Sequence, residues 1–457
     1  VSGNTSTSQF WAESGEFVAT IDVTNINTEG TYTLTVDEKV IDFKVSENTY
    51  ADLSDAAFKY YYFNRASTAI TTEFGGVYAR PTGLADTEIY VHASAATTAR
   101  PEGTIISAPK GWYDAGDYNK YIVNSGISTY TLMAAFEHYP DYLKTKAYDI
   151  PEKNNNIPDL LDEVKWNLDW MLDMQDPNDG GVYHKLTGLN FQGIILPEAY
   201  TARRYVVQKS TAAALNFAAV TAMASRIYAE YEDQLPGYSA RLIEASKNAY
   251  AWAKANPGIF YNQPSDVVTG EYGDTDVSDE FQWAAVELFI TTSEARYGND
   301  INVDEIESGI PFWNLSSPLA LISILTHEAE LSTSVNVAAA KSKFLSKGKE
   351  LLILDLSMPE NVAKNVTDLK GISLVNVDEL SKITDETLSS RKKEIPKAEV
   401  IIEKHKAEFN DWLNHRRFTP AIAALKQSLE TIKNDEINFQ RKKIVDFDES
   451  QAEIVTS

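Results

Sequence analysis

The sequence predicts a mainly α-helical protein with a short β-rich segment before the helices and a different kind of segment after them. Three observations lead to this prediction. Apolar residues recur at helical spacing between about residues 52 and 350. Before residue 46 they alternate with polar residues instead, as they do in half-buried strands. The composition then changes abruptly near Leu351.

Composition limits the classes of function that the chain can have. Its 457 residues are 43% hydrophobic and 23% charged, which excludes wholesale disorder. The net charge of −25 argues against nucleic acid or an anionic membrane surface as the main partner. Cysteine is absent, which excludes disulfides, thiolate metal sites and a cysteine nucleophile. No apolar run is long enough to span a membrane, so we expect no membrane partner.

The first segment, residues 1–45, is expected to form strands. Apolar residues alternate with polar ones in residues 17–23 and 32–36 and less regularly in residues 41–45, and Gly30 supplies a turn. An immunoglobulin-like β-sandwich needs about seven strands. We therefore interpret this segment as part of a β-sandwich whose beginning is missing. Its N-terminus has no basic or apolar stretch of an export signal, so either there is no such signal or it lies upstream.

The second segment, residues 46–350, has helical periodicity. The clearest stripe runs from Ile157 to Leu172, with Pro158 at the expected first turn. Long loops rich in aromatic residues, glycine and aspartate separate the helices. We therefore expect an α/α arrangement whose loops build a cleft on one face. The other predicted helices cover residues 56–62, 127–138, 211–231, 242–255, 280–291 and 319–327.

The third segment, residues 351–457, differs in composition from the rest. It holds 19 of the 66 acidic and 16 of the 41 basic residues, while all 24 tyrosines lie at or before Tyr297. This change suggests that two unrelated segments join near Leu351. We expect strands at residues 352–356 and 373–377. A charged helical stretch from residue 379 to about residue 440 follows, as a solvated arm or a dimerisation spine.

The passage with the most chemical potential is residues 111–121, Gly-Trp-Tyr-Asp-Ala-Gly-Asp-Tyr-Asn-Lys-Tyr. Asp114 and Asp117 are separated by two small residues, so their carboxylates can point to one volume that a ligand can approach. Two carboxylates that hold one water can activate it by general-base action. A calcium-binding or capping loop explains the two aspartates alone more readily. The flat side chains beside them, on which sugar rings can stack, are Trp112, Tyr113 and Tyr118.

Taken together, five passages in order resemble glycoside hydrolase family 9. This family contains inverting cellulases with an (α/α)6 barrel, and many bacterial members carry an immunoglobulin-like domain just ahead of it. The resemblance implies a partial immunoglobulin-like domain over residues 1–45 and a catalytic domain over residues 46–350. It also implies β-1,4-glucan as the partner and a secreted or periplasmic location. The passages are residues 74–81, 91–94, 111–121, 180–185 and 277–285.

The resemblance implies that Asp117 is the catalytic base and that Asp114 helps to hold the attacking water. Inverting hydrolysis also needs a carboxylic acid about 6.5–9.5 Å from the base. In the family this acid is a glutamate near the end of the barrel, after a histidine-containing stretch, and neither passage appears in this sequence. We therefore expect an incomplete barrel and weak or absent hydrolysis, since protonation of the leaving oxygen contributes about 10²–10⁴ in rate. Glucan binding without cleavage is the alternative. The loop glutamates outside any matching passage are Glu73, Glu88, Glu198 and Glu271.

Two weaker signals lie elsewhere in the matched passages. His184 and Lys185 follow a Gly-Gly turn where the family places cleft contacts, so we expect either sugar contacts or an ordinary surface turn. Asp276, Asp279 and Glu280 match a stretch where some family members bind Ca²⁺ through oxygen ligands. A helix N-cap with acidic first-turn residues explains this stretch equally well. We expect no required cofactor, with structural Ca²⁺ as the open alternative.

The third segment resembles glutamyl-tRNA reductase. Residues 352–362 resemble the end of its nucleotide-binding domain, and residues 376–380 and 409–413 resemble its linker and helical dimerisation region. That enzyme needs a cysteine nucleophile and a glycine-rich NADPH loop, and both are missing here, so we expect no reductase activity. The resemblance implies a dimer through C-terminal helices and a cytoplasmic enzyme. Because the two resemblances point to different compartments, a recombined or misassembled reading frame explains the join better than a selected fusion.

Overall fold

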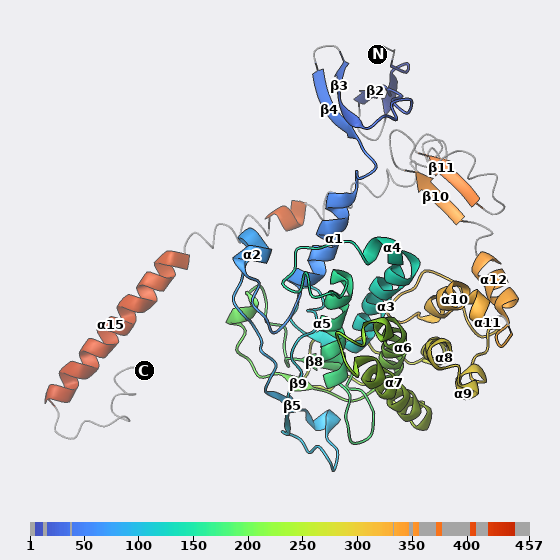
Figure 1. Ribbon diagram of the computed structural model, residues 1–457. Helices are drawn as coiled ribbons and strands as arrows, with labels where there is room; N and C mark the ends of the chain where they lie inside the picture. Colours follow the sequence, from blue (N-terminus) through green and yellow to red (C-terminus); the bar gives the residue numbers. More distant parts are fainter. Residues whose placement is uncertain are drawn as a thin grey trace. The chain divides into compact units, whose positions relative to one another are not determined.

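The computed structural model describes residues 5–11, 16–36, 39–331, 333–346, 351–355, 372–376, 403–407 and 419–443 (Figure 1). The chain divides into two compact units. One comprises Val1–Leu351 with Asp368–Ile372, and the other comprises Leu352–Thr367 with Ser373–Ser457. Among the described residues, no helix combines the length and the apolar character that crossing a membrane requires.

The strands and helices follow the expected order of strands, helices and a mixed tail. The strands are β1 (Gln9–Trp11), β2 (Glu16–Val18), β3 (Gly30–Val36), β4 (Lys39–Val45), β5 (Ile89–Val91), β6 (Ile105–Ile106), β7 (Lys120–Tyr121), β8 (Lys185–Thr187), β9 (Tyr205–Val206), β10 (Leu351–Asp355) and β11 (Ile372–Asn376). The helices are α1 (Ala51–Phe63), α2 (Thr72–Gly75), α3 (Ile122–His138), α4 (Pro140–Leu143), α5 (Asp159–Asp173), α6 (Thr211–Tyr228), α7 (Tyr238–Ala255), α8 (Ser278–Thr292), α9 (Ala295–Gly298), α10 (Ser317–Thr326), α11 (Glu328–Leu331), α12 (Val337–Ser346) and α15 (Thr419–Lys443).

The N-terminal strands form two separate two-stranded sheets, β1 with β2 and β3 with β4. The strands predicted at residues 32–36 and 41–45 are confirmed as β3 and β4, which pair antiparallel from Gly30↔Val45 to Val36↔Lys39. The strand predicted over residues 17–23 is wrong beyond Val18. The Asp22 carboxylate accepts hydrogen bonds from the Thr24 amide and hydroxyl at 2.9 and 2.6 Å, and this local turn competes with strand pairing.

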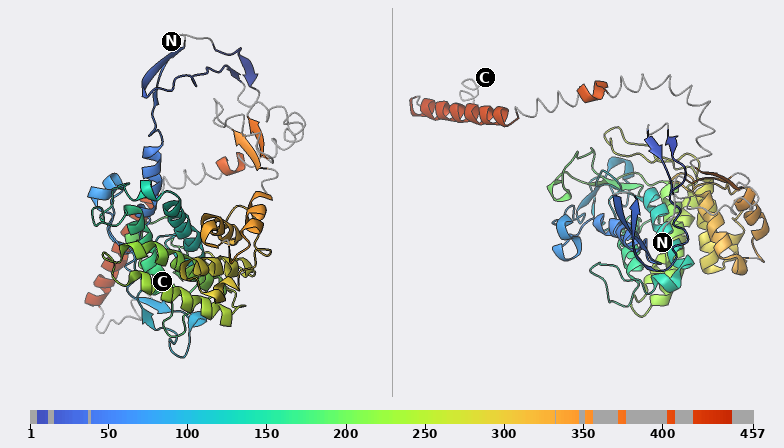
Figure 2. Two further views of the ribbon diagram at one scale, coloured as in Figure 1. Left: turned by 45° about the vertical axis from the view of Figure 1, so that its right-hand side comes forward. Right: turned by 90° about the horizontal axis from the view of Figure 1, so that it is seen from above.

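The helices pack around α6, which lies side by side with α7, α8 and α3 (Figure 2). Every residue of α6 except Arg226 is buried. Its runs of alanine let neighbouring helices approach closely on several sides, as is typical of a helix at the centre of a core. The α3 helix also packs on α5, and α8 packs on α10. The mainly helical prediction is therefore confirmed.

All the predicted helices of residues 46–350 are present, but several begin earlier than the periodicity indicates. The α3 helix begins at Ile122 rather than at residue 127, because its first turns contain Gly126, which weakens the periodic signal. A Cβ on Gly126 would lie 2.3 Å from the Asn216 side-chain oxygen of α6, so close helix packing explains this glycine. In α5 the predicted first-turn residue Pro158 is the N-cap, one residue outside the helix.

A five-stranded sheet of very short strands, in the order β6-β5-β9-β8-β7, was not predicted. Only the β5–β9 pair is parallel among these strands. The sheet connects loops that lie far apart in the sequence. In particular, Tyr121 of β7 pairs with Lys185 of β8, which brings residues 111–121 beside residues 180–187.

In the tail, the two predicted strands are confirmed as β10 and β11, each shifted by one residue, and they pair with each other. Helix occurs in residues 403–407 and in α15, within the predicted charged helical stretch. Of the three passages that resemble glutamyl-tRNA reductase, residues 409–413 lie wholly outside the described residues. Residues 356–362 of the first passage and residues 377–380 of the second also lie outside them.

Candidate active site

The passage of residues 111–121 forms a loop whose first residue must be glycine. Gly111 has φ +80°, and a Cβ on it would lie 2.8 Å from ring atoms of Trp170. The Asp114 amide donates to the Asn119 carbonyl oxygen at 3.1 Å, which closes the loop. Ala115 and Gly116 are exposed at its tip. The small residues between the two aspartates therefore face outward, where a ligand can approach.

Asp117 is 7% exposed and is held by two neutral donors. Its Oδ2 accepts from the Tyr121 hydroxyl at 2.7 Å and from the Asn119 side-chain amide at 2.5 Å. Among the described residues no hydrogen bond reaches Asp117 Oδ1. This oxygen can therefore accept a proton from a water without first breaking a bond to the protein.

Asp114 differs because both of its oxygens are occupied. Its Oδ1 accepts from the Asn124 amide at 2.7 Å, and its Oδ2 accepts from the Tyr272 hydroxyl at 2.9 Å. Burial raises the pKa of Asp114, against the effect of these two donors, and the nearby charge of Asp117 raises it further. The rings of Tyr121 and Tyr272 meet edge to face with centroids 4.7 Å apart, so a tyrosine pair links the two carboxylates.

The aromatic residues predicted to bind sugar lie beside this pair. Trp112 and Tyr113 are each 6% exposed, yet both line a cavity of about 110 Å³ together with Asp114 and Tyr121. The Trp112 indole donates to Glu163 Oε1 at 2.7 Å, which fixes its ring, and burial raises the pKa of Tyr113 to about 12. Tyr118 is half-buried, with its ring 4.9 Å from that of Tyr113. Stacking of sugar on these rings stays a prediction.

His184 and Lys185 are both 0% exposed, so the surface-turn alternative is wrong. The three protons of the Lys185 ammonium have three acceptors, Gln263 Oε1, Thr269 Oγ1 and the Gly270 carbonyl, at 2.9, 3.1 and 2.5 Å. Burial lowers the pKa of Lys185 to about 7, although three acceptors around one ammonium favour its charged form.

The His184 imidazole stacks on the Tyr261 ring with centroids 4.0 Å apart, and both ring nitrogens have partners. Nε2 donates to the Glu271 carbonyl at 3.0 Å and Nδ1 accepts from the Ser210 hydroxyl at 2.8 Å, an assignment that follows from the carbonyl being an acceptor only. Burial lowers the pKa of His184 to about 3. His184 and Lys185 thus hold the backbone of the two residues before Tyr272, which in turn holds Asp114.

The acidic stretch around α8 is arranged differently. Asp276 is exposed, and its Oδ1 accepts from the Ser278 amide and hydroxyl at 3.1 and 2.7 Å, which forms a local turn just before the N-cap Val277 of α8. Asp279 Oδ2 accepts from the Ser316 amide at 2.6 Å.

Glu280, by contrast, is 0% exposed, and in the described part of the chain no amide, hydroxyl or cationic group donates to either of its carboxylate oxygens. Burial, followed by a hydrogen bond shared with the neighbouring Asp279 carboxyl and by the charge of Asp279, raises the pKa of Glu280 well above its usual range. In the described part of the chain, no three His, Asp or Glu side chains are grouped as a metal site.

The four glutamates considered as a replacement for the missing acid lie at different places in the first unit. Glu73, Glu88 and Glu271 are exposed. Glu198 is half-buried in the short 3-10 helix Pro197–Ala199, and its charge raises the pKa of Tyr118, an effect smaller than that of burial. Glu198 is therefore close to the loop that carries Asp114 and Asp117.

Four residues of the site were missed as individual candidates in the sequence: Asn119, Tyr121, Asn124 and Tyr272. Asn119 and Tyr121 lie within the passage that was singled out, and Asn124 follows it by one helical turn, so a search for donors near the aspartates could have found them. Tyr272 lies 158 residues from Asp114, and no local pattern marks it.

Comparison with known proteins identifies relatives for both units. The family model described as glycosyl hydrolase family 9 matches residues 50–378, and that of the glutamyl-tRNA reductase dimerisation domain matches residues 397–457. A xyloglucan-specific endo-β-1,4-glucanase of Bacteroides ovatus, BoGH9A, is 47% identical over 285 residues. This alignment covers 61% of the chain and 49% of that relative, so the chain spans about half the relative's length.

A solved structure described as Bacteroides ovatus GH9 matches with a TM-score of 0.68 and 40% identity, and the match covers 75% of this chain and 64% of that one. For the tail, a glutamyl-tRNA reductase of Christiangramia forsetii is 55% identical over 109 residues, which is 24% of this chain and 26% of that enzyme.

Proposed function

Because the chain belongs to glycoside hydrolase family 9 over residues 50–378, we propose that its first unit binds β-1,4-glucan and holds the water that attacks the glycosidic bond. The observation that carries this proposal is the pair of carboxylates held by neutral donors. Asp114 has both oxygens occupied by Asn124 and Tyr272, whereas Asp117 keeps one oxygen available.

In this proposal Asp117 is the general base. Its Oδ1 accepts a proton from the attacking water while the Tyr121 hydroxyl holds Oδ2 in place. Asp114 helps to hold the water, since its charge lies near that of Asp117 and its orientation is fixed by two donors. Trp112, Tyr113 and Tyr118 provide ring faces along the sugar, and His184 with Lys185 act indirectly by positioning Tyr272.

The chain is proposed to lack an efficient proton donor for the leaving oxygen. No passage of the sequence matches the family's acid, and a glucan leaving group departs poorly as an unprotonated alkoxide. Since general-acid catalysis contributes about 10²–10⁴ in rate, hydrolysis of natural glucan should be slow or undetectable while binding is retained. We propose xyloglucan as the preferred glucan, because the Bacteroides ovatus relative is named for it.

Two kinds of substrate distinguish the contribution of the proposed base from the effect of the missing acid. A dinitrophenyl β-cellobioside has a leaving group that needs no proton, so the chain should cleave it while leaving xyloglucan and cellulose nearly intact. Asp117→Asn should lower cleavage of the activated glycoside by about 10²–10⁴. Asp233→Asn, at an exposed turn residue, is the control and should cleave at the unchanged rate.

Rapid release of reducing sugar from xyloglucan would overturn the missing-acid part of the proposal. Glu198→Gln then tests the half-buried loop glutamate as a replacement acid, since it should abolish cleavage of xyloglucan but spare the activated glycoside. Failure to bind any β-1,4-glucan in titration calorimetry would overturn the proposal as a whole.

We also propose a structural Ca²⁺ beside α8. The fully buried carboxylate of Glu280, to which no described amide, hydroxyl or cationic group donates, and the adjacent carboxyl of Asp279 fit a cation that prefers oxygen ligands. Because Asp276 already bonds the amide and hydroxyl of Ser278, the further ligands would be backbone or water oxygens rather than its carboxylate. Such an ion would neutralise the buried charge and stabilise the start of the helix, without a part in the chemistry.

The finer architecture is part of the same proposal. We propose that residues 46–350 form an incomplete (α/α)6 barrel and that residues 1–45 form part of an immunoglobulin-like β-sandwich. Family membership and the consecutive packed helices support the former, and the β3–β4 pair supports the latter. We also propose that the hydrolase part acts outside the cell or in the periplasm, whereas the tail resembles an enzyme that we expect to be cytoplasmic.

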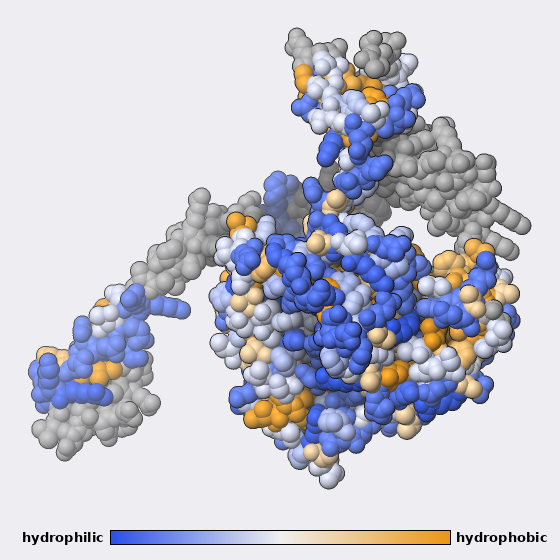
Figure 3. Space-filling model, viewed as in Figure 1, coloured by the Kyte–Doolittle hydropathy of each residue, from blue (hydrophilic) through white to orange (hydrophobic). Residues whose placement is uncertain are grey.

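The dimerisation domain over residues 397–457 supports a second candidate function, self-association through α15. Large apolar side chains 49–61% exposed occur along this helix at spacings of four, three and seven, which places them on one face: Leu425, Leu429, Ile432 and Phe439. Figure 3 shows these hydrophobic patches among hydrophilic atoms. We propose that this face binds the same face of a second copy.

Light scattering of the intact chain tests this association. The wild type should be a dimer and Leu429→Glu a monomer, because a charge at the centre of the face would be buried without a partner. Glu430→Lys, at an exposed position one residue along, is the control and should remain dimeric. A monomeric wild type at micromolar concentration would overturn the proposal.

A further inference from the structure

The connection from β8 to β9, residues 188–204, is long and stays close to the proposed base. It exceeds the length of about 12–15 residues beyond which a loop in a compact domain is commonly functional, and the 3-10 helix Pro197–Ala199 is its only regular element. The Gly188 amide donates to Asn119 Oδ1 at 3.0 Å, and the Tyr118 hydroxyl donates to the Ile195 carbonyl. Asn119 also holds Asp117.

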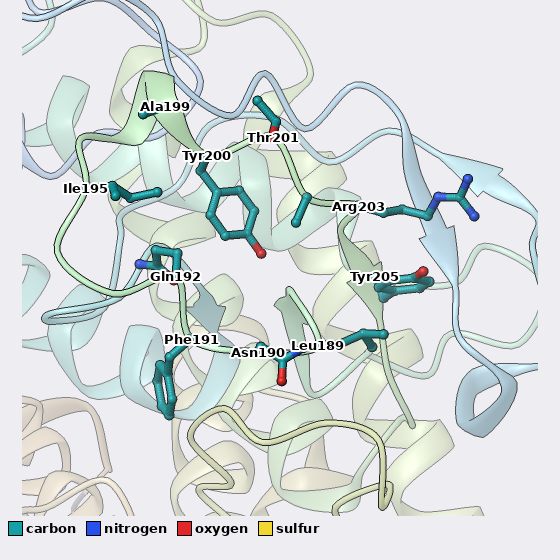
Figure 4. A pocket seen from close by; sticks show the side chains of 11 residues that line it. Leu189, Asn190, Phe191, Gln192, Ile195, Ala199, Tyr200, Thr201, Arg203 and Tyr205 are labelled. Carbon is teal, nitrogen blue, oxygen red and sulfur yellow. The ribbon is translucent and has the colours of Figure 1, made fainter. Parts of the chain in front are cut away.

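This loop and the first residue of β9 enclose a cavity of about 360 Å³, which lies in the range of roughly 300–1,000 Å³ typical of small-molecule sites. Figure 4 shows the Tyr200 ring pointing into the cavity from one side, with Leu189 and Asn190 on the other. Five of the eleven lining residues have aromatic or amide side chains: Asn190, Phe191, Gln192, Tyr200 and Tyr205.

The charge of this cavity suits a neutral ligand. Among the described residues that line it, Arg203 alone is charged. Its guanidinium lies 4.4 Å from the centre of the Tyr90 ring and points away from the cavity in Figure 4. Ring faces that cover C–H groups, with amides that bond hydroxyls, match the chemistry of an uncharged sugar.

A glycine makes the position of Tyr200 possible. A Cβ on Gly188 would lie 1.8 Å from the Tyr200 hydroxyl oxygen. Gly188 is not among the residues with positive φ, so alanine there meets no backbone strain. Glycine is therefore required at position 188 because of the close approach of the Tyr200 hydroxyl and not because of the backbone conformation. Gly188→Ala should accordingly displace the Tyr200 ring without removing it.

We propose that this cavity, hereafter the branch pocket, binds a neutral pentose or hexose branch of a substituted β-1,4-glucan whose main chain lies along the loop of Asp114 and Asp117. The hydrogen bonds of Gly188 and Tyr118 place the pocket beside that loop. A branch leaving the main chain can therefore enter the pocket while the backbone stays at the carboxylates. This inference rests on the proposed binding of glucan by the first unit and adds the residues that recognise the branch.

Titration calorimetry with two matched sugars tests the branch pocket. Cellotetraose has no branches, whereas the xyloglucan heptasaccharide has a backbone of the same length with xylose branches. The wild type should bind the heptasaccharide about tenfold or more tightly. Tyr200→Ala should remove most of this preference and leave the affinity for cellotetraose unchanged, because it truncates a side chain that contacts only the branch.

Gly188→Ala should have the same selective effect as Tyr200→Ala, because it pushes the ring out of its place. A thermal melt will show whether Tyr200→Ala lowers the stability of the protein. If it does, Gly188→Ala still tests the role of the Tyr200 ring. Tyr139→Ala, at a 67% exposed tyrosine after α3, is the control and should bind both sugars as the wild type does.

Three outcomes separate this inference from the proposed function. Equal affinities of the wild type for both sugars would overturn the branch pocket but leave glucan binding intact. Parallel losses for both sugars in Tyr200→Ala and Gly188→Ala would mean that the pocket holds the main chain, which also overturns the inference. No binding of either sugar would overturn the proposed function itself.

Discussion

Two acidic passages of the first unit, residues 114–117 and 274–280, look alike in sequence but differ in how one carboxylate, that of Glu280, is held. In the first, Asp114 and Asp117 receive four hydrogen bonds from neutral amide and hydroxyl donors. In the second, Asp276 and Asp279 also accept from amide or hydroxyl donors, whereas the Glu280 carboxylate is fully buried and receives no such bond from the described residues.

The difference shows what makes a buried carboxylate usable as a base. Neutral donors keep the ionised form of a carboxylate accessible, because they bond to it without removing its charge. A carboxylate with no donors must instead take up a proton or a cation, since burying the bare charge is very unfavourable. The first passage is thus suited to act on a water, and the second is suited to be neutralised.

The largest expected effect is a difference in the free energy of unfolding between substitutions at two glutamates of α8, Glu287 and Glu280. Glu287 is 0% exposed like Glu280, but its carboxylate bonds the Arg226 guanidinium at 2.7 Å and the Ser323 hydroxyl at 2.5 Å. Glu287→Gln should lower the free energy of unfolding by about 3–5 kcal/mol, because it leaves a buried arginine short of a partner. Glu280→Gln in a chelator-containing buffer should change it by less than about 1 kcal/mol or raise it. Chemical denaturation at pH 7 measures both, and equal losses would contradict the comparison.

The pH dependence of stability gives the next effect. The folded pKa of Glu280 is raised above its usual value of 4.5, so the folded state binds this proton more tightly than the unfolded state does. The stability from this group is present below pH 4.5 and is lost as the pH rises toward the folded pKa. The slope cannot exceed about 1.4 kcal/mol per pH unit. Without Ca²⁺, the wild type should lose stability between pH 5 and 7 relative to Glu280→Gln. Parallel stability curves for the two proteins would contradict a protonated Glu280.

A smaller effect is expected at the first passage, where the donors can be removed one at a time. Tyr272→Phe removes one hydrogen bond from Asp114 and should lower cleavage of the activated glycoside by roughly tenfold, the equivalent of about 1.4 kcal/mol. Because the ring contact with Tyr121 survives, the melting temperature should change little. Tyr297→Phe, which changes a buried tyrosine of α9, is the control, and an equal loss of rate there would contradict a specific role of Tyr272.

The comparison also shows which parts of the fold and of the site could be predicted from the sequence alone. The helices and the β3–β4 pair follow from local periodicity, and the break near Leu351 follows from composition. The family of the tail was inferred from the resemblance of its passages and not from composition. The aspartates were found because they stand three residues apart. Tyr272 could not be found, since it reaches Asp114 only after His184 and Lys185 have fixed the backbone before it. The burial of His184 and the lack of donors to Glu280 among the described residues depend on how distant helices pack, which no local pattern encodes.

The smallest expected effect is that of Ca²⁺ on the second passage. At a concentration ten times its dissociation constant, an ion that binds only the folded state stabilises it by about 1.4 kcal/mol. For a unit of this size the melting temperature should therefore rise by a few degrees at most, roughly 2–4 °C. Glu280→Gln should abolish the rise, whereas Asp276→Asn should retain it, because the Asp276 carboxylate is already engaged by the amide and hydroxyl of Ser278. Mg²⁺ at the same concentration should have little effect, since it demands a tighter octahedral arrangement. If Ca²⁺ leaves the melting temperature unchanged while the pH dependence holds, Glu280 is neutralised by a proton. The two passages would then differ in donors alone and not in the ion that they attract.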